Sequence, residues 1–163
     1  METIYFYNQN EKPYGCFSNF SKHGITADGK YWATSEHFFQ AQKFAGTPHE
    51  ERVRLTPTPK AAAELGRDRS LPLRTDWEMV KEEVMRRALY AKFTQHPDLG
   101  SLLLATGNAE LVENTQGDIY WGCGKDGTGK NRLGILLMEL REQLRAENPN
   151  PGNREESQHT MNL

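Results

Sequence analysis

Residues 35–45 form the part of this sequence whose side chains are best suited to acid–base chemistry. In a helix of about 100° per residue, Glu36, Gln40 and Lys43 fall within roughly 60° of one another. Phenylalanines flank this polar stripe on both sides, whereas a solvated helix face normally has polar neighbours. Partial exclusion of water would raise the pKa of the carboxyl and lower that of the lysine, as acid–base or nucleophilic roles require. An ordinary exposed helix face is the simpler alternative, because Glu and Lys are common there.

The histidine and cysteine residues are weaker candidates. His37 lies about 100° from Glu36 on the same helical wheel, so it points away from the polar stripe. Cys16 and Cys123 are far apart in the chain and belong to no CxxC pair or His/Cys cluster. A metal site, a disulfide framework and a thiol nucleophile are therefore not expected.

A glycine-rich loop at residues 121–131 resembles two phosphate-binding motifs without satisfying either. Its glycines, starting at Gly122, match GxGxxG, but no βαβ unit surrounds them. It also matches GxxxxGK, but Asn131 stands where a P-loop needs Ser or Thr for magnesium. Glycines before a helix N-terminus could still hold a phosphate, helped by Lys130 and Asn131. A plain glycine-rich connection explains the loop equally well.

Basic, amide and aromatic side chains elsewhere could contact a nucleotide-like ligand. Arg67, in a polar turn after a predicted helix, could pair with a phosphate through its guanidinium group. Asn19 and Phe20 lie in a loop and could contact a base or a sugar. Trp32 and Trp121 could stack on a heterocycle, although tryptophans are more often part of a core.

The elements that must position these side chains are predicted to be mostly helical. Helices are expected at residues 35–45, after Pro48, at 58–65 before Gly66, from a capping box at 75–78 to Phe93, from 96–97 to Gly107, and at 131–145. Strands are expected at 3–7, in a hairpin at 25–32 with an Asp-Gly turn, at 111–115 and at 119–121. Because the strands are few, short and not interleaved with the helices, the predicted class is α+β, mainly helical, and not a doubly wound sheet.

Length and composition narrow the possibilities further. A chain of 163 residues favours one domain, and a net charge of −2 argues against nucleic-acid binding driven by overall charge. No apolar run reaches the roughly 18–20 residues of a membrane span, and no secretory signal is apparent. These features predict a reduced, cytoplasmic protein. Residues 146–163 are polar and rich in Asn, Pro and Glu, so a disordered tail is expected after a domain at 1–145.

Four motifs, in order and correctly spaced, resemble the NADAR family. They are FSNF at 17–20, WATSEHFFQAQKF at 32–44, GRDRS at 66–70 and YWGCGKDGTGKNRLGILLMELR at 120–141. The likeness is greatest to the YbiA-like branch, the riboflavin-intermediate N-glycosidases. It extends over nearly the whole chain up to about residue 145.

The resemblance implies a single compact, mostly helical YbiA-like domain that hydrolyses N-glycosidic bonds. Members of the YbiA-like branch cleave the ribose–amine bond of phosphoribosylamino-pyrimidines, which are early intermediates of riboflavin synthesis. Other members of the family remove ADP-ribose from guanine. The resemblance implies no metal, and no cofactor, membrane or obligate protein partner is expected.

This chemistry suggests roles for the candidate residues. Glu36 would stabilise positive charge on the sugar or activate water. Lys43 would donate a proton to the leaving amine or form a Schiff base with the ring-opened ribose, and these alternatives stay open. Gln40 would orient sugar hydroxyls. The remaining candidates divide into phosphate contacts and base or sugar contacts: Arg67, Gly122, Lys130 and Asn131 for the former, and Asn19, Phe20, Trp32 and Trp121 for the latter.

Two other functions compete with hydrolysis of a small metabolite. One is the same chemistry on ADP-ribosylated guanine in nucleic acid, which the net charge of −2 mildly disfavours. The other is a non-catalytic module that binds ADP-ribose or a nucleotide. Such a reader would keep its ligand, without turnover, when Glu36 is replaced by Gln.

Overall fold

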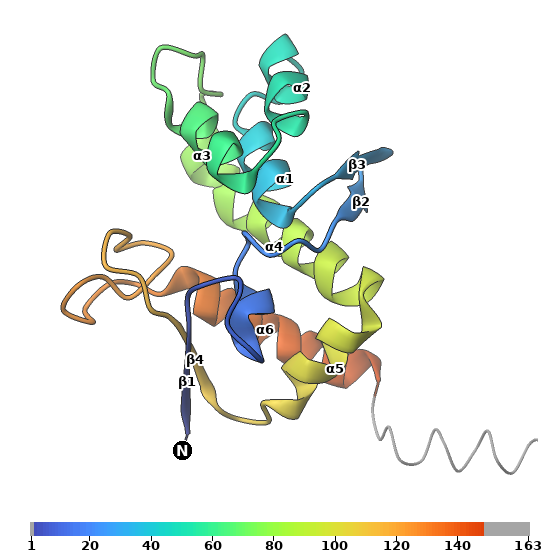
Figure 1. Ribbon diagram of the computed structural model, residues 1–163, viewed down its shortest axis with the longest axis vertical. Coiled ribbons are helices and arrows are strands. Elements are labelled where there is room, and N and C mark those ends of the chain that lie inside the picture. The colour runs from blue at the N-terminus through green and yellow to red at the C-terminus, as the bar shows by residue number, and fades with distance from the viewer. Residues whose placement is uncertain (1, 149–163) are drawn as a thin grey trace, which may run out of the picture.

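The computed structural model describes residues 2–148, and helices dominate it, as predicted (Figure 1). In chain order the elements are β1 Thr3–Phe6, a 3-10 turn η1 Tyr14–Phe17, β2 Ile25–Ala27, β3 Lys30–Trp32, α1 Ser35–Gln42, α2 Pro48–Arg54, α3 Pro59–Arg67, α4 Trp77–Gln95, α5 Pro97–Ala105, β4 Glu110–Glu113 and α6 Arg132–Glu147. The mainly helical α+β class is thereby confirmed. The last helix continues two residues past the predicted domain boundary at 145. Residues 149–163 of the predicted tail lie outside the described part of the chain.

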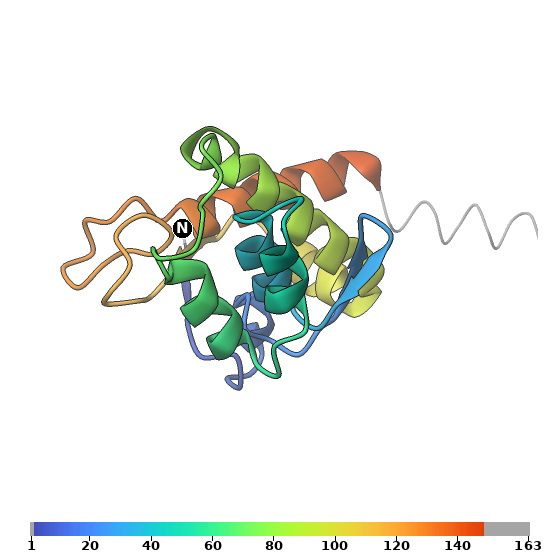
Figure 2. The same cartoon turned by 90° about the horizontal axis from the view of Figure 1, so that it is seen from above.

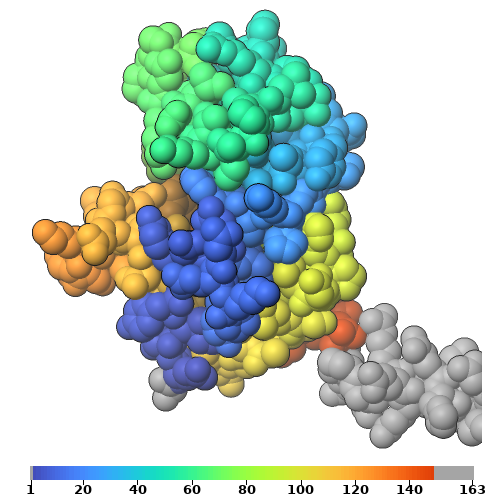
Figure 3. All heavy atoms as spheres, in the orientation of Figure 1, coloured from blue at the N-terminus to red at the C-terminus, as the bar shows by residue number. Residues whose placement is uncertain are grey.

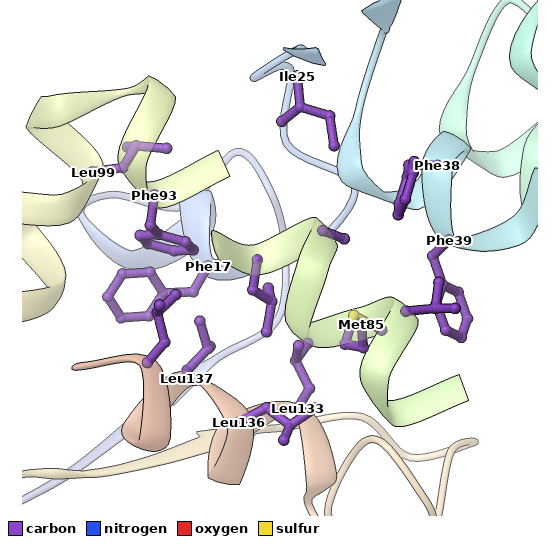
Figure 4. Packing of buried hydrophobic residues seen from close by; sticks show 14 of the residues in the cluster. Phe17, Ile25, Phe38, Phe39, Met85, Phe93, Leu99, Leu133, Leu136 and Leu137 are labelled. Atoms are coloured by element: carbon purple, nitrogen blue, oxygen red, sulfur yellow. The ribbon is translucent and has the colours of Figure 1, made fainter. Parts of the chain in front are cut away.

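The long helix α4 runs through the middle of the fold and carries much of the core. It packs against α1 and β2 on one side and against α5 and α6 on the other. Figure 4 shows Phe17 and Phe93 meeting Leu137 of α6, while Met85 of α4 lies near Phe39 of α1. Fully burying such a side chain stabilises the fold by about 1.5–3 kcal/mol. The leucine stripe expected on the last helix is buried throughout, at Leu133, Leu136, Leu137, Leu140 and Leu144.

The strands form two separate pairs. Strand β1 lies parallel to β4, with Thr3 opposite Glu110 and Phe6 opposite Glu113. The predicted hairpin is confirmed, and positive φ angles of 55° at Asp28 and 75° at Gly29 suit its two-residue turn. The strand expected at 119–121 is wrong. Those residues lie in the loop before α6, and their carbonyl groups accept hydrogen bonds from the backbone of that loop and the start of α6.

The ends of the helices agree with the sequence at most points but not at three. The helix expected at 35–45 ends at Gln42, with Lys43 as its C-cap. Threonines cap α1, α2 and α3, each accepting a backbone N–H with its hydroxyl group. The stop predicted at Gly66 is wrong, because α3 includes this residue and brings its bare Cα against Gln40. The capping box predicted at 75–78 is also wrong. Asp76 occupies the N-cap of α4, but its carboxylate pairs with Arg74 and caps no backbone N–H.

Candidate active site

A cavity of about 310 Å³ lies where α1, α3, α4 and the loops at 17–20 and 114–131 meet. Figure 2 shows α1, α3 and the start of α4 on one side, with the loop before α6 facing them. The side chains around the cavity are Ser18, Asn19, Phe20, Glu36, Phe39, Gln40, Lys43, Arg67, Trp77, Lys81, Met85, Glu113, Asp118, Tyr120, Trp121 and Leu133. Seven of the eleven site residues expected from the sequence are therefore brought together around one space.

Helix α1 forms the floor of this cavity and is buried along its whole length. The alternative of an exposed helix face is therefore wrong. Thr34 caps the helix with its hydroxyl, and the Asn19 carbonyl accepts the backbone N–H of Glu36 at 3.2 Å. The Asn19 side chain also accepts a hydrogen bond from the Ser35 hydroxyl at 2.9 Å. The loop at 17–20 thus holds the first turn of α1, which carries Glu36.

Glu36 is a buried carboxylate with a directed hydrogen bond. The Nε2 group of Gln40 donates to Glu36 Oε1 at 2.7 Å, as the spacing of four residues along a helix allows. Burial raises the pKa of Glu36, while the Gln40 hydrogen bond and the positive charges of Arg67 and Lys43 oppose that rise. Gln40 therefore orients Glu36 in this structure, whereas a role with sugar hydroxyls had been expected for it.

Lys43 follows one turn after Gln40 and lies between aromatic rings. Its Nζ atom is 5.9 Å from the Phe39 ring centroid and 5.7 Å from that of Trp77, and it donates to the Gly66 carbonyl at 3.3 Å. Burial, with the nearby positive charge of Arg69, lowers the pKa of Lys43 to about 8. Roughly one molecule in ten then carries a neutral, nucleophilic amine at pH 7.

A groove of about 690 Å³ adjoins the cavity and shares Ser18, Phe20, Arg67, Glu113 and Asp118 with it. Its other lining residues come from 7–9, 115–117 and Lys60. In Figure 3 the segments that carry these residues meet on the visible face. The side chains of Arg67 and Lys60 make no hydrogen bond or ion pair with any residue in 2–148. Two unpaired cations on one groove suit an anionic ligand group.

Two acidic groups of the cavity were missed by the sequence analysis. Glu113 ends β4, and Asp118 lies in the loop that follows. Their place in the cavity depends on the parallel pairing of β4 with β1, which joins segments over a hundred residues apart. An acidic residue at the end of an apolar strand was the available signal. Lys60 was missed because an exposed lysine early in a helix looks ordinary.

The aromatic side chains divide between the cavity wall and the core. Trp121 lines the cavity and meets Phe39 edge to face, with ring centroids 5.4 Å apart. Phe20 lines both the cavity and the groove. Trp32 does neither: it is 1% exposed, and its Nε1 donates to the Ala27 carbonyl. The stacking role expected for Trp32 is therefore wrong, because both faces of its ring are covered.

The glycine-rich loop does not form the expected phosphate site. The backbone N–H groups of residues 130–133 donate to the carbonyls of residues 119–122, so these N–H groups at the start of α6 are already bonded. Lys130 is exposed and lies near the Tyr120 ring, outside the cavity. The Asn131 side chain bonds backbone groups of β4. Gly122 lets the loop approach the end of that strand closely. The loop thus braces β4.

His37 and the two cysteines lie outside the cavity lining. The His37 ring makes hydrogen bonds with the Thr34 hydroxyl at 2.8 Å and the Thr56 carbonyl at 3.1 Å. Both cysteines are free. Within residues 2–148 no three His, Cys, Asp or Glu side chains converge as ligands for a metal ion. Among the helices described in that range, none is long and apolar enough to cross a membrane.

Comparison with known proteins gives one consistent family. The model of the NADAR domain matches residues 5–145. The chain is 58% identical over 146 residues to N-glycosidase YbiA of Escherichia coli (strain K12), covering 90% of this chain and 91% of that protein. It is 40% identical over 148 residues to Riboflavin biosynthesis protein VVA0006 of Vibrio vulnificus (strain YJ016), covering 91% of this chain and 40% of that longer protein.

A solved structure agrees with the sequence relatives. The NMR structure of the Escherichia coli protein YbiA superposes with a TM-score of 0.85 at 57% identity. The match covers 91% of this chain and 88% of that structure. Fold and sequence therefore lead to the same group of proteins.

Proposed function

Because this chain belongs to the NADAR family, we propose that it is an N-glycosidase that acts in the cytoplasm on phosphoribosylamino-pyrimidine intermediates of riboflavin biosynthesis. The observation that carries the proposal is the placement of Glu36 and Lys43 one above the other on the buried floor of a single cavity. A carboxylate and a second polar group close to the same carbon can catalyse cleavage of the ribose C1′–N bond, as paired groups do in glycoside hydrolysis.

Glu36 acts at C1′ of the ribose. Positive charge develops on the sugar as the C1′–N bond breaks, and a carboxylate held by the Gln40 N–H is already oriented to stabilise it. The same carboxylate can then take the proton of the attacking water. The surrounding aromatic side chains exclude bulk water, which strengthens both effects.

Lys43 acts as an amine that attacks C1′ of the ring-opened ribose. The sequence left this role open beside that of a proton donor. The lowered pKa of about 8 supports the nucleophilic role of Lys43. At pH 7 it makes the neutral fraction of this amine several hundredfold larger than that of an exposed lysine. The resulting imine would be hydrolysed by water that Glu36 activates.

Arg67 and Lys60 bind the 5′-phosphate in the groove. Both are unpaired among the described residues, and Arg67 lies where the groove meets the cavity. Trp121 and Phe20 offer ring surface to the pyrimidine. Asn19 lines the same cavity and supports Glu36 through its carbonyl.

The test is to incubate the protein with a 5-phosphoribosylamino-pyrimidine or with ADP-ribosyl-guanosine and follow the released sugar phosphate by mass spectrometry. Release from the pyrimidine substrate is expected. With Glu36→Gln, kcat should fall by about 10²–10⁴-fold, the range typical of acid–base groups. An isosteric amide keeps the shape of the site while removing the charge.

Other outcomes would change the assignment. Release from ADP-ribosyl-guanosine alone would move the activity to modified guanine. Tight binding of either compound without release, unchanged by Glu36→Gln, would identify a non-catalytic reader. Full activity of Glu36→Gln on the pyrimidine substrate would remove the carboxylate from the mechanism.

A further inference from the structure

The Glu113 side chain lies in the cavity without a hydrogen-bond partner. It lines both the cavity and the groove, and its buried Oε2 atom bonds to no group in residues 2–148. An ionised carboxylate in such a place would lack the donors that stabilise negative charge. A protonated carboxyl is instead a hydrogen-bond donor that a bound ligand can satisfy.

The charges around Glu113 differ from those around Glu36. Burial, together with the negative charges of Asp118 and Glu36, raises the pKa of Glu113 to about 8. Burial also raises the pKa of Glu36, but there the Gln40 N–H and the positive charges of Arg67 and Lys43 oppose the rise. Among the described residues, no hydrogen-bond donor or positive charge opposes the rise at Glu113 in this way. Of the two carboxyls Glu113 is therefore the better placed to keep its proton, and such a difference is the usual arrangement for an acid and a base.

The backbone of Glu113 is held firmly. Its N–H donates to Asn131 Oδ1 at 2.9 Å, and its carbonyl accepts from the Cys123 N–H at 3.0 Å. A methyl group added at Gly122 would lie 3.1 Å from that carbonyl oxygen, so only glycine lets the loop pack so closely. A side chain anchored on a strand and braced by a loop can hold a proton at a defined place.

We propose that Glu113 is a further catalytic residue, the general acid that protonates the departing nitrogen; this inference rests on the proposed function. The C1′–N bond breaks with its electron pair on nitrogen, and that nitrogen takes the Glu113 proton. On the closed ring, water then captures C1′, and the proton that this water loses goes to Glu36. On the ring-opened ribose, the Lys43 amine adds to C1′ before this bond breaks and its proton goes to Glu36, and water afterwards hydrolyses the resulting imine to free Lys43. Exchange with solvent returns a proton to Glu113 and removes one from Glu36.

The kinetic test compares kcat and KM of the protein with those of Glu113→Gln, Glu113→Asp and Glu110→Gln on a 5-phosphoribosylamino-pyrimidine. Glu110 lies on the same strand but is exposed, so it is the matched control. For Glu113→Gln, kcat should fall by about 10²–10⁴-fold with little change in KM. Glu113→Asp should recover at least tenfold of that loss, because it restores an acid, and Glu110→Gln should match the unmodified protein.

A second measurement does not depend on activity. A folded-state pKa above the unfolded one means that the folded protein holds the proton between about pH 4.5 and 8 while the unfolded chain releases it. The contribution of Glu113 to the free energy of unfolding therefore decreases as the pH rises from about 4.5 to 8. The melting temperature of Glu113→Gln, relative to the unmodified protein, should rise steadily from pH 5 to 8.

Three results would overturn the inference. They are a kcat for Glu113→Gln within threefold of the unmodified protein, equal losses in the Gln and Asp variants, and a melting difference that stays constant between pH 5 and 8. The second of these would make Glu113 a positioning residue. If the unmodified protein releases no sugar phosphate at all, the proposed function fails, and the role of Glu113 fails with it.

Discussion

Chemically similar side chains of this protein acquire different properties from their surroundings. Glu36 and Glu113 share one cavity, but donors and cations face only the first. Lys43 is buried among aromatic rings, whereas Lys60 remains exposed on the groove. A carboxyl group can therefore suit the role of a base or of an acid, and a lysine amine can suit the role of a nucleophile or of a contact for an anion. Burial and neighbouring charges decide which of these roles is available.

Lys43 gives a direct test of the amine role. Reduction with borohydride during turnover should attach the ribose phosphate to Lys43, which peptide mass mapping would locate. Lys43→Arg keeps the positive charge but cannot form an imine, so it should show no adduct and a kcat lower by about 10²-fold or more. The same replacement at exposed Lys22 is the control. An active Lys43→Arg variant would leave Lys43 without a nucleophilic role.

The contact between α1 and α3 depends on Gly66. This glycine is buried, and its carbonyl accepts hydrogen bonds from Lys43 and Arg69. A Cβ atom there would overlap Oε1 of Gln40, the residue that orients Glu36. Glycine at this position costs some helix propensity, but a larger side chain would displace Gln40 and its hydrogen bond to Glu36.

Gly66→Ala should consequently lower activity more than stability. The gain in helix propensity, about 1 kcal/mol, offsets part of the overlap. Loss of the Gln40 hydrogen bond to a charged group, worth about 1.5–3 kcal/mol, should reduce kcat roughly 10–100-fold. Steady-state kinetics and thermal melting would check both, with exposed Glu64→Ala on the same helix as the control. A variant with undiminished kcat would contradict this account.

The start of α6 is tied to β4 by Asn131. This residue has a left-handed backbone with φ of 50°, and its side chain bonds the Glu113 N–H and the Leu111 carbonyl, each at 2.9 Å. Asparagine tolerates that conformation better than most residues. The hydrogen bonds and the backbone geometry together fix the strand that carries Glu113.

Asn131→Ala should therefore destabilise the fold. Two lost hydrogen bonds, at about 1 kcal/mol each, and left-handed strain of about 1–2 kcal/mol sum to roughly 3–4 kcal/mol, measurable by urea unfolding. Asn131→Gly should regain only the part of the unfolding free energy that Asn131→Ala loses to backbone strain, because glycine adopts the left-handed conformation but makes neither hydrogen bond. Lys130→Ala should change neither stability nor KM appreciably, since Lys130 lies outside the cavity. A large rise in KM for Lys130→Ala would restore the phosphate role first expected for it.

At the scale of the whole molecule, a buried lysine on the central helix α4 connects the core to the loop at 17–20. Lys92 of α4 is 0% exposed, and its Nζ donates to the Ser18 carbonyl at 2.8 Å. That contact fixes the loop at 17–20, which in turn holds the start of α1. Burial lowers the pKa of Lys92 to about 7. The lysine thus links the core to the cavity at some cost to stability.

Lys92 makes the stability of the protein depend on pH. Between about pH 7 and 10.5 the unfolded chain binds a proton that the folded protein does not, so this contribution to stability rises with pH. The stability of Lys92→Met relative to the unmodified protein should therefore be highest at pH 7 and decline toward pH 10. Urea unfolding across this range would measure it, with Lys22→Met as the control. A constant difference would contradict the lowered pKa.

Local patterns in the sequence predicted the helices, the hairpin, the leucine stripe of α6 and the polar stripe of Glu36, Gln40 and Lys43. Such features depend on residues close together in the chain, adjacent in the hairpin turn and three or four apart on the helices, so their physical causes are local. The motifs also indicated the family. The sequence left the glycine-rich loop open between a phosphate site and a plain connection. Local pattern could not decide, because the carbonyls that bond the N–H groups at the start of α6 belong to residues 119–122 of the folded loop.

Long-range packing decided the rest. Trp32 lies in the core. Glu113 lies in the cavity only because β4 pairs with β1, which is more than a hundred residues earlier in the chain. Lys60 and Arg67 share one face of α3 through their spacing of seven residues, but that face lines a groove only because residues 7–9 and 115–118 form much of the rest of the lining. Residue types and spacing thus determined which chemistry was available. Tertiary contacts alone decided which groups lose water and which charges face one another, and these set proton affinity and reactivity.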